Sequence, residues 1–124
     1  STQAKTLFPY TTLFRSGFSA EWRVVAGYAR SQLREYPQAI AHFSELVRMS
    51  PDDAAGYHFL AETQRAAGQP ERAVTTLERA LLVLRESSLT LRMLGDGNSD
   101  AVRYVPAVTA YRRALAIDAA DADA

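Results

Sequence analysis

Apolar positions recur along the chain at helical spacing, in short segments separated by polar or glycine- and proline-containing stretches. Pro37 is compatible with the first turn of a helix, and Gly68 is a typical helix stop. The connectors Ser50–Asp53 and Glu86–Ser88 each offer a residue that can cap the following helix. The pattern therefore predicts an all-α fold, with helices over about 20–33, 37–49, 54–67, 70–84, 88–96 and 105–117.

The fifth predicted helix meets a break. Asp96-Gly97-Asn98-Ser99-Asp100 follows the segment that begins at Ser88. Gly97 alone costs about 1 kcal/mol relative to alanine in a helix, and the Asn, Ser and Asp residues favour caps and turns. We expect this helix to fray or stop near Asp96.

The same stretch resembles the start of a calcium loop, because Asp96, Asn98 and Asp100 match its first three ligand spacings. The rest of the loop pattern fails. Ala101 stands where the sharp turn needs glycine, and Ala107 stands where a bidentate acid is needed. A polar loop or an interrupted helix is the favoured interpretation, and no metal site is predicted.

The predicted helices repeat with a fixed step of 34 residues, from Ala39 to Ala73 and from Ala73 to Ala107. Other columns keep this step, and self-similarity of this kind is typical of stacked-repeat proteins. Small residues let two antiparallel helices approach closely, and we expect the large column to fill the space toward the next pair. The small column is Gly27, Ala61 and Gly95, and the large column is Phe43, Leu77 and Tyr111.

This pattern resembles the tetratricopeptide repeat (TPR), over about residues 20–119. The resemblance implies an α-solenoid of three antiparallel helix pairs, wound as a right-handed superhelix. The repeats would cover about 20–53, 54–87 and 88–121 of a domain that spans 17–124. The middle copy fits best, through Tyr57, Leu60, Ala61, Gly68, Ala73, Leu77 and Ala80.

Both ends of the chain depart from the repeat. Residues 1–16 have no acidic residue, and TLFPYTTLFRS resembles a translated sequencing-adapter tail. We interpret 1–16 as non-native and expect the true N-terminus to be missing, so the location stays open with a slight preference for the cytoplasm. AADADA at 119–124 resembles the lead-in to a fourth copy. Val108, Tyr111 and Leu115 would then lack a neighbour on one side, so we expect an internal piece of a longer, bacterial protein.

Composition excludes several kinds of chemistry. The chain has no cysteine, which excludes disulfides and thiol catalysis, and no apolar run approaches a membrane span. Its formal net charge of zero argues against a nucleic-acid surface. His42 and His58 lie on different helices, without a nucleophile or metal-ligand pattern. We predict a protein that is not an enzyme, with no catalytic, cofactor or metal site.

The resemblance implies that the first helix of each pair lines a concave groove. The mixed surface would suit an extended peptide or a partner helix. The family's carboxylate clamp for chaperone tails needs charged or amide donors, but its matching positions here are Val24, Tyr28, Phe59, Leu89 and Met93. The predicted groove residues are Glu21, Val24, Tyr28 and Ser31, then Ala55, His58, Glu62 and Arg65, and finally Leu89, Arg92 and Asp96.

We therefore predict a scaffold that binds a protein or peptide partner other than a chaperone tail. The alternative is the TPR arm of a larger enzyme, for example a bacterial transferase, whose catalytic domain lies outside this sequence. RNA binding is a weaker alternative, because the chain lacks a basic stripe.

Overall fold

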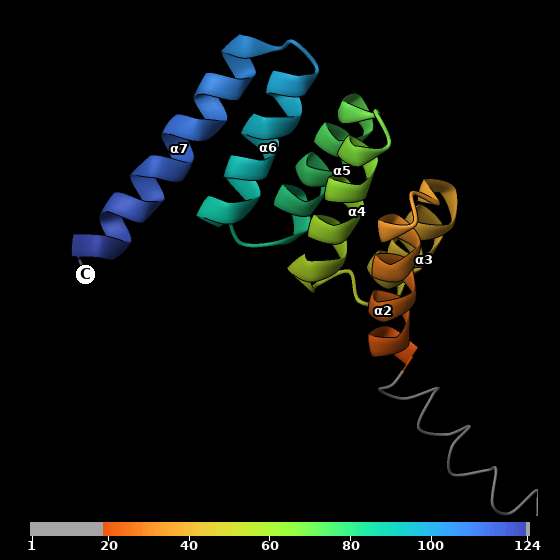
Figure 1. Cartoon of the computed structure of the whole chain (residues 1–124). Coiled ribbons are helices and arrows are strands. Elements are labelled where there is room, and N and C mark those ends of the chain that lie inside the picture. Colours follow the sequence, from red (N-terminus) through yellow and green to blue (C-terminus); the bar gives the residue numbers. More distant parts are fainter. Residues whose placement is uncertain (1–18, 124) are drawn as a thin grey trace, which may run out of the picture.

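The computed structural model of the protein describes residues 19–123, so the interpretation of 1–16 lies outside the described residues. The described chain is all helical, and its helices follow one another as a row of hairpins (Figure 1). Their bounds are Ser19–Gln32 (α2), Tyr36–Met49 (α3), Ala54–Ala66 (α4), Pro70–Val83 (α5), Ser88–Asp100 (α6) and Tyr104–Asp123 (α7).

The helices pack as three antiparallel pairs that stack in sequence. α2 packs on α3, α4 on α5 and α6 on α7, while α3 contacts α4 and α5 contacts α6 between pairs. The first helices of the second and third pairs, α4 and α6, also contact each other. Each helix thus meets only near neighbours in the chain, which is the arrangement of an α-solenoid. The predicted all-α solenoid is confirmed.

The alanine column marks the closest approach within each pair. Ala39, Ala73 and Ala107 are almost fully buried, at 0%, 0% and 3% exposure. The glycine positions are equally tight: a Cβ on Gly27 would lie 2.6 Å from Cε1 of Phe43, and one on Gly95 would lie 2.5 Å from Cε1 of Tyr111. Small side chains are therefore required on both helices of a pair.

The small and large columns are matched in size. An aromatic ring faces glycine in the first and third pairs, where Phe43 and Tyr111 lie over Gly27 and Gly95. In the middle pair, the smaller Leu77 packs in one cluster with Ala61 instead. The large column also reaches the next pair, as expected. The Phe43 ring stacks on Phe59 of α4, with centroids 5.1 Å apart, and partly buried Met93 and Leu94 of α6 pack against the Leu77 cluster.

The two connectors between pairs provide the predicted caps. Asp53 Oδ1 accepts a hydrogen bond from the N–H of Ala55 (3.0 Å) at the start of α4. Ser87 Oγ accepts one from the N–H of Thr90 (3.1 Å) at the start of α6. Each cap satisfies an amide that has no partner inside its helix, so the sequence signals for these helix starts are correct.

The three turns inside the pairs share one backbone geometry. Arg34, Gly68 and Val102, again 34 residues apart, have φ of 60°, 78° and 61°. After each of them, the next N–H donates to the carbonyl five residues back, at 2.9, 2.8 and 2.7 Å, as in a Schellman motif. Only Gly68 adopts this left-handed conformation without a Cβ penalty. The packing of the helices therefore holds Arg34 and Val102 in a strained conformation.

The expectation that the fifth helix stops near Asp96 is wrong, since α6 continues to Asp100. The glycine that weakens the helix also lets it dock: a Cβ on Gly97 would lie 3.1 Å from Cγ2 of Val74 on α5. Asn98 Nδ2 donates to the carbonyl of Leu94 within the helix (3.1 Å). Tertiary packing outweighs the local propensity of about 1 kcal/mol.

The last helix also differs from expectation, because α7 runs to Asp123 and residues 119–123 continue it. One face of α7 is open. Val108 and Leu115 are 45% and 67% exposed, whereas their repeat equivalents Val74 and Val47 are 2% and 8% exposed. In the earlier pairs this face is covered by the following helix, through contacts such as Val74 to Gly97. The predicted lack of a neighbour is observed at these two positions.

Candidate functional site

The eleven predicted groove residues all lie on α2, α4 and α6, the first helices of the three pairs. They follow the same columns in each repeat, because residues 34 apart take equivalent places. The structure separates them by how they meet the neighbouring pair. Those at the junction of α4 with α6 bind one another, whereas those at the junction of α2 with α4 surround an open hollow.

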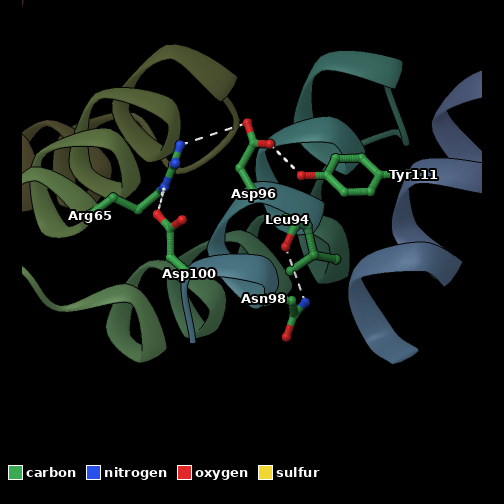
Figure 2. A network of polar contacts seen from close by, with 6 residues as sticks. All are labelled: Arg65, Leu94, Asp96, Asn98, Asp100 and Tyr111. Carbon is green, nitrogen blue, oxygen red and sulfur yellow. Dashed lines mark hydrogen bonds and ion pairs between the residues drawn. The ribbon is translucent and has the colours of Figure 1, made fainter. Parts of the chain in front are cut away.

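Salt bridges between side chains join α4 to α6 (Figure 2). Arg65 Nε donates to Asp100 Oδ2 at 2.8 Å, and Arg65 Nη1 lies 3.7 Å from Asp96 Oδ2. Tyr111 of α7 donates its hydroxyl proton to Asp96 Oδ1. Burial, followed by this bond to a carboxylate, raises the pKa of Tyr111 to about 12. Two predicted groove residues, Arg65 and Asp96, are thus already partners within the chain.

A second polar bridge joins the same helices nearer their N-terminal ends. His58 Nε2 lies 2.7 Å from Thr90 Oγ1, and this hydroxyl lies 2.8 Å from the capping Ser87 Oγ. Thr90 is buried and His58 is partly buried. Burial, the largest cause, lowers the pKa of His58 below its ordinary value, which favours the neutral ring. His58 therefore ties α4 to α6 rather than standing free in the groove.

The junction of α2 with α4 is open instead. Tyr28 and Ser31 of α2 and Glu62 of α4, all predicted groove residues, line a hollow of about 370 Å³. Tyr28 is 57% exposed and Glu62 is exposed. Ser31 Oγ donates to the carbonyl of Tyr28 (2.7 Å) in its own helix, so it does not reach across. The rest of the lining is Gln32, Arg34, Tyr36, Phe43, Phe59, Thr63 and Ala66.

Sequence reasoning missed part of this lining. Tyr36 and Phe43 belong to α3 and Arg34 belongs to the turn, whereas the predicted groove includes first helices only. Phe59 enters the prediction only as a clamp position without a clamp side chain, but its ring stacks on Phe43 and both line the hollow. A sequence signal for this lining exists, because the large column to which Phe43 belongs is expected to reach toward the next pair.

Arg92 and Asp96 line a second hollow, of about 400 Å³, between α6 and α7. Leu89, Tyr111 and Leu115 give it an apolar wall. The remaining predicted residues, Glu21 and Val24 of α2 and Ala55 of α4, lie outside both hollows. Glu21 is exposed and Val24 is partly buried against the core cluster of the first two pairs.

The structure also shows the contacts of the residues in the calcium-like pattern. Asp96 and Asp100 of the calcium-like pattern share Arg65, and Asn98 bonds within its own helix. Between residues 19 and 123 no cluster of three or more acidic, His or Cys side chains could hold a metal ion. Over the same range, no helix combines the length and apolar character that membrane crossing requires.

Comparisons with known proteins agree with this architecture. The sequence matches a family model described as tetratricopeptide repeat over residues 31–92, half of the 124-residue chain. The chain therefore belongs to the tetratricopeptide repeat family. No curated protein sequence matches it.

Two solved structures share its fold at low sequence identity. A crystal structure of MamA protein has a TM-score of 0.72 and 20% identity, with 86% of this chain and 58% of that chain covered. A second, MamA MSR-1 C2, has a TM-score of 0.72 and 13% identity, with 90% and 64% covered. This chain thus spans about three fifths of the length of the structures it matches. TPR repeats support a role as a protein-interaction scaffold in general.

Proposed function

We propose that the chain is a non-catalytic scaffold that binds an extended peptide or partner helix along α2, α4 and α6. The hollow between α2 and α4 is the principal contact. It offers exposed Tyr28 beside the stacked rings of Phe43 and Phe59, with Glu62 at its side. Aromatic side chains in a partly open hollow suit recognition of peptides, because they offer large apolar area at low entropic cost.

A single observation carries this proposal. The equivalent positions in the next repeat, Arg65 and Asp96, are occupied by contacts inside the chain, whereas Ser31 and Glu62 leave space between their helices. At the junction of α4 with α6, a ligand would have to displace an internal ion pair. At the junction of α2 with α4, where the hollow lies, it would not. Binding there adds contacts without breaking existing ones.

The test is a selection of peptides from a displayed random library against the chain, followed by affinity measurements on two variants. Tyr28→Ala should weaken the selected peptides about tenfold or more, as expected of an aromatic contact. Tyr104→Ala is the matched control, since Tyr104 is also exposed (62%) but lies at the start of α7. Peptides that bind Tyr28→Ala as tightly as the wild type, or a failure to select any, would overturn the proposal.

A further inference from the structure

The ion pair at the second junction provides an internal template for the first. Shifting Arg65 and Asp96 back by one repeat of 34 residues leads to Ser31 and Glu62. The acid is therefore present at both junctions, whereas the arginine is present only at the second. Asp100, which also binds Arg65, shifts to the uncharged Ala66. Glu62 thus occupies the position equivalent to Asp96, but the chain has no arginine at the position equivalent to Arg65.

The hollow is built to take such a guanidinium from outside. Glu62 lines it and joins no ion pair within residues 19–123. Tyr28, Tyr36 and Phe59 line it as well, and aromatic rings attract cations over their faces. Guanidinium combines a planar, weakly hydrated group that stacks on rings with a fork of donors that fits a carboxylate.

One charge in the lining works against a cation. Arg34 lines the same hollow from the turn between α2 and α3. Arg30, one helical turn earlier, pairs with Glu35, with 2.5 Å between Nη1 and Oε2, and does not pair with Glu62. The hollow is thus polarised between Arg34 and Glu62, and a cationic side chain is expected to sit against Glu62.

We infer that the hollow between α2 and α4 binds an arginine side chain of the partner, with its guanidinium on Glu62 and stacked on the aromatic wall. This inference rests on the proposed function and specifies the partner's chemistry at the same site. The partner would supply in trans what Arg65 supplies in cis to Asp96.

The experiment uses the peptides selected above and varies one group on each side. Arginine in a selected peptide is replaced by citrulline, its neutral isostere, and Glu62→Gln removes the charge of the protein. Each single change should weaken binding about tenfold, and both together should weaken it no further than one alone, because the two changes remove the same contact. Arg34→Gln should strengthen binding of the arginine peptide, while Glu71→Gln, which neutralises an exposed acid on α5 away from the groove helices, is the matched control.

Other outcomes separate this inference from the proposed function. Peptides that depend on Tyr28 but bind equally well with arginine or citrulline would overturn the arginine assignment and leave groove binding in place. Equal binding of a lysine peptide would overturn the need for a planar guanidinium. Independent, additive effects of citrulline and Glu62→Gln would show that these two groups do not meet. Peptides that bind Tyr28→Ala as tightly as the wild type would overturn both proposals.

Discussion

The two junctions between repeats use the same columns but are held together differently. Between α4 and α6, His58 bonds to Thr90 and Arg65 binds two carboxylates, so the first helices are tied directly. Between α2 and α4, the equivalents of these groups include Val24 and Ser31, which cannot form either bridge. A repeat protein can therefore keep one backbone plan while polar side chains decide which junction is closed and which offers a hollow.

The largest change would break both junctions at once. Ala73→Trp places a large ring at a position with 0% exposure in the shared middle pair, and overpacking should cost about 3 kcal/mol or more. Thermal melting followed by circular dichroism should show a large fall in Tm or loss of the fold. Ala41→Trp, on the exposed side of α3, is the control and should melt near the wild type. An unchanged melt for Ala73→Trp would contradict the stacked arrangement.

A smaller change would break only the closed junction. Arg65→Ala leaves Asp96 and Asp100 without their cation and should lower the free energy of unfolding by about 1 kcal/mol, because the pairs are partly exposed. Ser31→Ala, the equivalent change at the open junction, should have almost no effect. Urea unfolding of both variants measures the difference. Equal losses would show that the network adds nothing to the second junction.

Relief of backbone strain should stabilise the outer repeat without altering either junction. Val102 has φ of 61°, which costs a residue with a Cβ about 1–2 kcal/mol, while glycine loses part of this gain through its more flexible unfolded state. Val102→Gly should therefore stabilise the chain by about 0.5 kcal/mol. Gly68→Val should do the opposite at the equivalent turn. Unfolding midpoints in urea test the pair, and stabilisation by both would refute the explanation.

The closed junction should also respond to acid. Burial holds the pKa of His58 below 6.5, so the unfolded chain takes up protons at a higher pH than the folded chain. The free energy of unfolding should fall as pH drops below about 6.5 and level off below the folded pKa. His42, whose pKa is lowered by burial, then by Arg23 and Arg30, acts in the same direction. His58→Gln should make the fall shallower; an unchanged pH profile of unfolding midpoints would contradict this.

The smallest effect would come from closing the open junction. Ser31→Arg introduces the residue found at Arg65 and should let it pair with Glu62, adding about 0.3 kcal/mol of stability. The sharper readout is binding, since an arginine in the chain would compete with the partner's arginine for Glu62. Selected peptides should lose affinity for Ser31→Arg but not for Ser31→Ala. Retained affinity for both variants would show that this part of the hollow is unused.

Most of the fold can be predicted from the repeat, since residues such as Ala39 and Ala73 must be small wherever paired helices touch. The error at Asp96–Asp100 has a physical cause: helix propensity is a local property, whereas Gly97 gains from contact with Val74 on another helix. No single stretch of sequence contains that balance. The exposure of Leu115 on α7, by contrast, is expected from the repeat pattern.

The sequence predicts the repeat positions of the candidate site, but not which of these residues are already paired inside the chain. The resemblance and helical spacing together select Tyr28, Ser31 and Glu62 on α2 and α4, and the hollow includes all three. Arg65 and Asp96 carry opposite charges on the first helices of neighbouring repeats, and only the structure shows that they pair. The hollow itself lies beside the stacked rings of Phe43 and Phe59, and whether space remains between helices follows only from three-dimensional packing.

The exchange of glycine plus aromatic for alanine plus leucine between repeats has a consequence for mutational tolerance. Neither Gly27→Ala nor Phe43→Leu alone restores a fitted pair, since one crowds the ring and the other leaves a void. Made together, they reproduce the combination already present at Ala61 and Leu77. The backbone constrains the combined side-chain volume of two positions on different helices. Both residues can therefore differ between repeats, provided that they are substituted together.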